Sequence, residues 1–155
     1  MERKLEVSFN SPQCGWMSIG FDDGVSEFHT TTAHAPHESA LPELMGILTK
    51  LADPSSSEKK FLLKWNRDPE EFVFQFNRVD ELLTINIYQY PTDDRDSAER
   101  ELVFSHTGTV RQTVNAFALT FEQLYADRET DEFEFNWRQP FPVADLERFR
   151  SAIAV

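Results

Sequence analysis

The chain has 155 residues, and its 15 Lys and Arg residues against 27 Asp and Glu residues give a formal net charge of -12. This length predicts a single domain that spans residues 1–155. The excess negative charge repels phosphate groups, which argues against nucleic acid and anionic membranes as partners. Apolar residues make up 40% of the chain and 14 residues are Phe, so aromatic bulk can fill a core and disorder is not expected.

The N-terminus and the cysteine content predict a soluble, cytoplasmic protein. Residues 1–7 have no apolar run after their basic residues and no small-residue cleavage site, so they do not read as a signal peptide. No apolar segment approaches the roughly 18 uninterrupted residues that a membrane helix needs. The single cysteine, Cys14, cannot form an internal disulfide, which agrees with a reducing compartment.

The first third of the chain predicts short strands followed by a helix. Apolar and polar residues alternate in residues 5–9 and 17–21, which is the pattern of half-buried strands. Asp22-Asp23-Gly24 follows and predicts a tight hairpin, with a third strand at about residues 25–32. Between residues 41 and 51 the apolar residues recur at intervals of three and four, which predicts a helix that faces the core.

The second half carries a stronger strand signal. Alternation predicts strands at residues 61–65, 72–76 and 83–87, with a further strand at about residues 100–105. A long helix is predicted to start at Thr109, because Thr109 and Gln112 have the spacing of a capping box. Pro140-Phe141-Pro142 opens a short last helix.

The predicted order of elements is three strands, a helix, four strands and two helices. Strands joined by short polar turns pair antiparallel, and helices segregated along the sequence cover one face of such a sheet. We therefore predict the α+β class, as a two-layer sandwich. One antiparallel meander sheet of about seven strands carries two long helices and a short C-terminal helix on one face.

Aromatic segments mark the second half of the chain. They include the strand Glu71-Phe72-Val73-Phe74-Gln75-Phe76 and a closing series of Trp137, Pro140-Phe141-Pro142 and Leu146-Glu147-Arg148-Phe149. Together with the N-terminal hairpin and the Leu-rich helix, this order resembles a family of uncharacterised small bacterial proteins over most of the chain. The resemblance implies a bacterial, cytoplasmic protein of α+β architecture. It implies no reaction, ligand or catalytic residue.

Three of the four histidines lie close together in the sequence. His29, His34 and His37 fall within nine residues and can in principle converge on a zinc ion. They lack a Cys partner, helical i, i+4 spacing and an HExxH motif, which favours polar loop histidines over a metal site. No nucleophile motif or phosphate-binding glycine array occurs, so we predict neither a cofactor nor a catalytic residue.

Acidic residues concentrate in two stretches, residues 93–101 and 127–134. From them we single out Asp93, Asp94, Asp96, Asp131 and Glu132 as candidate protein-binding residues. Neither stretch has the central glycine of a calcium loop. They are either solvated loops that keep an acidic protein soluble, or a negative surface that steers a basic protein into contact.

Two tyrosines bear on that choice. If Ile85 and Ile87 face the helices, strand alternation places Tyr88 and Tyr90 on the opposite face. Tyr is favoured at interfaces because it brings a large contact area at low entropic cost. The alternative is that both rings only cover the sheet, or pack on Trp65 or on a loop.

These features favour a non-enzymatic module whose acidic, Tyr-bearing surface binds a basic protein. The concrete version is a bacterial immunity or antitoxin-like protein, because a basic nuclease cleft is a natural target for a compact acidic domain. A first alternative is a small-ligand or metal-binding domain, or a minor enzyme, with a Phe-lined pocket and the loop histidines. A second is a homodimer joined through the open sheet face.

Overall fold

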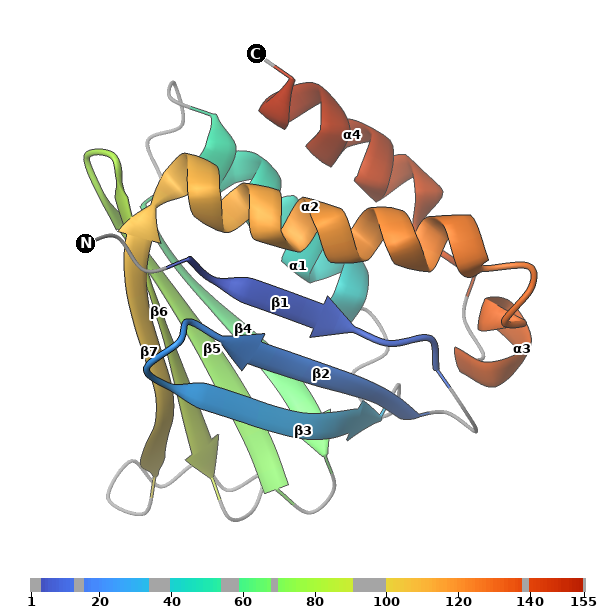
Figure 1. Cartoon of the computed structure of the whole chain (residues 1–155), viewed down its shortest axis with the longest axis horizontal. Helices are drawn as coiled ribbons and strands as arrows, with labels where there is room; N and C mark the ends of the chain where they lie inside the picture. The colour runs from blue at the N-terminus through green and yellow to red at the C-terminus, as the bar shows by residue number, and fades with distance from the viewer. Residues whose placement is uncertain are drawn as a thin grey trace.

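The computed structural model describes residues 4–12, 16–33, 40–53, 59–67, 70–90, 100–137 and 140–154. The strands are β1 (Glu6–Phe9), β2 (Trp16–Asp22), β3 (Glu27–Ala33), β4 (Lys60–Arg67), β5 (Glu70–Val79), β6 (Leu82–Tyr90) and β7 (Glu101–Thr109). The helices are α1 (Ala40–Ala52), α2 (Val110–Asp127), α3 (Phe133–Trp137) and α4 (Val143–Ile153). Figure 1 shows α1, α2 and α4 together on one side of the strands.

The strands form two antiparallel sheets. The smaller sheet has the order β1-β2-β3, and the larger sheet has the order β4-β5-β6-β7. The α+β class and the pairing of consecutive strands within each sheet are confirmed, but the prediction of one sheet of about seven strands is wrong. Short turns enforce pairing between neighbours in the chain, whereas α1 lies between β3 and β4 and removes that constraint.

The two sheets pack against each other through aromatic rings on their inner faces. The ring centroids of Phe21 in β2 and Phe74 in β5 lie 5.7 Å apart, and those of Phe9 and Trp65 lie 5.5 Å apart. Both pairs are edge-to-face, the arrangement that the ring quadrupoles favour. Phe117 from α2 contacts both Phe9 and Phe21, so the helix layer closes the same core.

The hydrophobic periodicity predicts correctly which side chains form this core. In the larger sheet the inner positions are at most 1% exposed, namely Phe72, Phe74, Phe76, Leu83, Ile85 and Ile87. In α1 the predicted stripe is buried as well, with Leu41, Leu44, Met45, Leu48 and Leu51. Each such side chain contributes about 1.5–3 kcal/mol by burial, so these patterns determine the orientation of the elements.

The predicted hairpin at Asp22-Asp23-Gly24 is confirmed as the turn between β2 and β3. Gly24 has a φ of 85°, a conformation that glycine adopts without steric cost. Asp22 Oδ1 accepts a hydrogen bond from the Gly24 N–H at 2.8 Å. Asp23 Oδ1 accepts hydrogen bonds from the N–H groups of Val25 at 3.0 Å and Ser26 at 2.8 Å. The two aspartates therefore stabilise the turn from both sides.

The long helix begins where the sequence predicts it. Thr109 is the N-cap of α2, and its Oγ1 accepts a hydrogen bond from the Gln112 N–H at 3.1 Å. The predicted C-terminal helix is α4, whereas the five-residue helix α3 was not predicted. Within the described ranges, no helix combines the length and the apolar character that crossing a membrane requires.

Candidate functional site

The first candidate surface lies where α2 ends and α3 begins. We call it the acidic tip, and it consists of the exposed residues Glu129, Asp131, Glu132, Glu134 and Phe135. Two of the predicted binding residues, Asp131 and Glu132, belong to it. The other predicted acids, Asp93, Asp94 and Asp96, lie outside the described residues. The structure therefore bears on the second acidic stretch of the sequence.

Phe135 gives the acidic tip an apolar centre. Its neighbours two residues away, Phe133 and Trp137, are 1% and 2% exposed, whereas Phe135 is 77% exposed. Phe133 packs edge-to-face on Phe141 with ring centroids 5.1 Å apart, which fixes α3 against the core. The ring of Phe135 is left on the surface, next in sequence to the exposed Glu134, and aromatic residues are enriched at protein interfaces.

Hydrogen bonds hold the acidic tip in a defined conformation. Ser11 Oγ donates to Asp131 Oδ2 at 2.6 Å, which ties the tip to the segment after β1. Asn136 Nδ2 donates to the carbonyl oxygens of Asp131 and Glu132, both at 3.1 Å. Because these groups are already ordered, binding through this surface loses less conformational entropy than binding through a flexible segment.

Among the described residues, the cations Arg128 and Arg150 are engaged by other groups. Arg128 donates to the Tyr125 carbonyl at 2.6 Å, and its guanidinium lies 3.8 Å from the centroid of the Tyr125 ring. The hydrogen bond from Arg150 lowers the pKa of Glu122, against the opposing effect of burial. In the part of the chain that the structure describes, no ion pair joins a Lys or Arg to the acidic tip.

The second candidate surface is the outer face of the larger sheet, which carries both predicted tyrosines. Tyr88 is half-buried beneath the guanidinium of Arg100, which lies 4.1 Å from the ring centroid. Tyr90 is 7% exposed and therefore presents little surface to a partner. Strand register places Lys60 and Lys64 on this same outer face. The face is thus less acidic than the net charge of the chain suggests.

One predicted metal ligand falls within the described ranges. His29 Nε2 donates to Glu27 Oε1 at 3.0 Å, and the two side chains are 62% and 63% exposed. His34 and His37 lie outside the described residues. No three His, Cys, Asp or Glu side chains of the described segments are arranged to hold a metal ion. Metal binding gains no support from the described geometry.

A buried ionisable pair was not predicted. His106 Nδ1 in β7 donates to Asp23 Oδ2 at 2.8 Å, and the side chains are 2% and 0% exposed. Burial raises the pKa of Asp23, but hydrogen bonds from Ser26, His106 and Val25 outweigh it and lower the pKa to about 2. The pair joins the smaller sheet to the larger one. Its burial and its contacts indicate a structural role.

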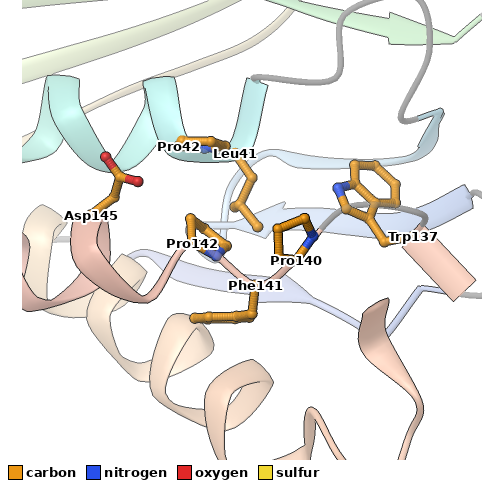
Figure 2. Close-up of a pocket in the computed structure, with 7 residues that line it drawn as sticks. All are labelled: Leu41, Pro42, Trp137, Pro140, Phe141, Pro142 and Asp145. Atoms are coloured by element: carbon orange, nitrogen blue, oxygen red, sulfur yellow. The ribbon is translucent and has the colours of Figure 1, made fainter. Parts of the chain in front are cut away.

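A small hollow lies beside the start of α1 (Figure 2). Its volume is about 210 Å³, and its lining residues are Leu41, Pro42, Trp137, Pro140, Phe141, Pro142 and Asp145. This is smaller than a typical ligand pocket, which measures about 300–1,000 Å³. The Asp145 carboxylate is 3.0 Å from the guanidinium of Arg148 and so already has a cationic partner.

A larger hollow lies at the β1 edge of the smaller sheet, between α2 and β3. We call it the sheet hollow; its volume is about 380 Å³. Its apolar lining residues are Leu5, Val7, Phe21, Ala116 and Leu119, and the other lining residues are Lys4, Glu6, Ser8, Gly20, Asp22 and His29. Among the apolar residues, Leu119 is 73% exposed, whereas Leu5, Phe21 and Ala116 are at most 7% exposed. The hollow therefore combines one exposed apolar side chain with several polar groups.

Comparisons with known proteins do not assign a family to this chain. No family model, no curated protein and no solved structure matches it. The resemblance to small bacterial proteins therefore stays a prediction. Function has to be argued from the surfaces themselves, because a fold alone does not imply a function.

Proposed function

We propose that this protein is a non-enzymatic binding module that engages a basic protein through the acidic tip. The observation that carries the proposal is the 77% exposed ring of Phe135, which lies in one short segment with four exposed carboxylates, those of Glu129, Asp131, Glu132 and Glu134. A bacterial immunity or antitoxin-like protein, which would cover the basic cleft of a nuclease, is the concrete form of this proposal.

The two components of the acidic tip contribute in different ways. Burial of a Phe ring in a complementary pocket stabilises a complex by about 1.5–3 kcal/mol. The carboxylates of Glu132 and Glu134 would attract a cationic surface and accelerate association by roughly 10- to 1,000-fold at low salt. Phe135 therefore supplies affinity, and the acids supply the rate and the selection of a basic partner.

The experiment compares tagged variants in their capture of proteins from the native cells at low and high salt. Wild-type protein should retain a basic partner at low salt, and both Phe135→Ala and the double variant Glu132→Lys/Glu134→Lys should lose it. Leu62→Ala is the control, because Leu62 is also exposed, at 69%, but lies on β4. Capture of the same protein by every variant, or a partner whose retention does not depend on salt, would contradict the proposal.

A second candidate is a homodimer through the outer face of the larger sheet. Four aliphatic side chains of this sheet are more than half exposed, namely Leu62, Val79, Leu82 and Leu102. Light scattering across a range of protein concentrations tests this candidate. A dimer should dissociate when Leu62 and Leu102 are replaced by Ser, whereas a monomer at every concentration excludes it.

A further inference from the structure

We propose that the sheet hollow binds an arginine side chain presented by a partner protein. This site is separate from the acidic tip, and the proposal does not depend on what the tip binds. Figure 1 shows the framework, with α2 running alongside the edge strand β1 of the smaller sheet. The hollow of about 380 Å³ starts at α2, crosses β1 and ends over β3.

The exposed side chain of Leu119 fits the aliphatic stem of the ligand. Leu119 on α2 is 73% exposed and lines the hollow beside Ala116, whereas the strand register turns Val7 to the inner face together with Phe21. Arginine side chains commonly lay their methylene groups along apolar surface while the charged head reaches polar groups. A stem laid along Leu119 would point its head across β1 toward Gly20 in the central strand of the smaller sheet.

Gly20 forms the floor of the hollow. A Cβ atom at this position would lie 2.6 Å from His29 Nδ1 and 2.9 Å from Ser8 Oγ, so these two side chains approach each other over the bare glycine. His29 Nε2 donates to Glu27 Oε1 at 3.0 Å, which helps to fix the imidazole ring beside Gly20. The Ser8 hydroxyl therefore supplies a hydrogen-bond acceptor where the ligand head would arrive.

Three carboxylates lie next to Gly20 on the outer face of the smaller sheet. The strand register places Glu6 opposite Asp22, and Asp22 opposite Glu27, on the outer face of the smaller sheet. Like charges directly opposite each other destabilise a sheet. In the described part of the chain, no ion pair joins Glu6 or Asp22 to a cation, although Lys4 also lines the hollow. A bound cation would relieve this repulsion.

Guanidinium fits these groups better than a metal ion or an ammonium group. The described side chains around the hollow do not form a metal-binding set. Directly opposite residues lie about 5 Å apart across an antiparallel pair, so one planar fork of five N–H donors can reach two carboxylates. An ammonium group is a compact point charge and cannot span them in the same way.

The test is a titration of the ¹⁵N-labelled full chain, followed by amide chemical shifts. The probe is arginine with blocked termini, and blocked lysine and the neutral isostere citrulline are the comparison ligands. The arginine probe should shift the amides of Ser8, Gly20 and His29. It should bind more tightly than blocked lysine and more tightly than citrulline. Removing two charges in Glu6→Gln/Asp22→Asn should weaken arginine binding by about 5- to 10-fold.

Two further variants make the result decisive. Gly20→Ala should weaken arginine binding while its dispersed spectrum shows that the sheet is intact, because the added methyl displaces Ser8 and His29. Glu134→Gln, on the acidic tip, should leave arginine binding unchanged. Equal binding of arginine and citrulline, shifts centred on the acidic tip, or no shift at millimolar probe would each overturn the proposal.

Discussion

The two sheets bury similar inner faces but present outer faces of opposite charge. Inside, both contribute Phe rings to one core, as the contact of Phe21 with Phe74 shows. Outside, the smaller sheet carries the carboxylates of Glu6, Asp22 and Glu27, and the larger sheet carries the cations of Lys60, Lys64 and Arg100. The core dictates one face of each sheet and leaves the other available for recognition.

This difference changes the meaning of the net charge of -12. A uniform negative surface would favour solubility and little else. Here the acids of the smaller sheet and of the acidic tip lie apart from the cations of the larger sheet. The acidic surfaces would select cationic partners, and the outer face of the larger sheet would not. The proposals for the acidic tip and the sheet hollow both place cationic ligands on acidic surfaces.

The largest expected difference in stability is between substitutions on the two faces of a single strand, β4. Leu63 and Leu62 are neighbours in β4, but Leu63 is 1% exposed on the inner face and Leu62 is 69% exposed on the outer face. Leu63→Ala should lower the free energy of unfolding by about 3 kcal/mol because it leaves a cavity in the core. Leu62→Ala should change it by less than about 0.5 kcal/mol. Urea denaturation measures both, and equal losses would contradict the assignment of faces.

The next effect concerns the pair that joins the sheets. Asp23→Ala removes the acceptor of His106 and of two turn N–H groups, so the free energy of unfolding should fall by about 3 kcal/mol. Asp22→Ala is the matched control, since Asp22 accepts one hydrogen bond in the same turn and should cost about 1 kcal/mol. If the two variants unfold at the same urea concentration, the buried pair does not contribute to stability.

A smaller effect is the dependence of stability on pH. Because folding lowers the pKa of Asp23 from 3.8 to about 2, the folded state favours the ionised form. The resulting stabilisation, about 2 kcal/mol, is present above pH 4 and is lost as the pH falls toward 2. Asp23→Asn cannot titrate, so its deficit relative to wild type should shrink over this range. A constant deficit between pH 5 and pH 2 would refute the assignment.

Much of the fold follows from local pattern, and the exceptions have physical causes. Alternation identifies the inner residues of β5 and β6, and Asp-Gly identifies the first hairpin, because both signals are carried by adjacent residues. The division into two sheets depends on how the chain continues after α1, which no strand pattern encodes. The pair of Asp23 and His106 spans 83 positions, and local sequence does not specify such a partner.

The candidate site was also predicted only in part, because local sequence identifies some of its residues and not others. Asp131 and Glu132 are exposed as the acidic run suggests, because unpaired carboxylates stay in water. Phe135 was not singled out, since a Phe that alternates with polar residues looks like a core residue. The sheet hollow needs β1, β2, β3 and α2 together, so neither the single glycine at its floor nor any one strand could reveal it.

The smallest expected effect tests the opposite charges of the outer faces directly. Glu6→Gln removes one of two like charges that face each other across β1 and β2, so the free energy of unfolding should rise by about 0.5 kcal/mol. Lys64→Gln is the control on the larger sheet, where the residue opposite is the uncharged Val73, and it should change stability less. Urea denaturation at low ionic strength measures both.

Salt distinguishes repulsion from any other consequence of Glu6→Gln. The Debye length falls to about 3 Å at 1 M salt, which is shorter than the distance between the paired strands. The gain in stability should therefore disappear at high salt. A gain that persists would mean that Gln improves packing or strand propensity, and the carboxylates would then not be in conflict. A gain that vanishes means that Glu6 and Asp22 repel each other in the free protein, and this is the repulsion that a cation in the sheet hollow would relieve.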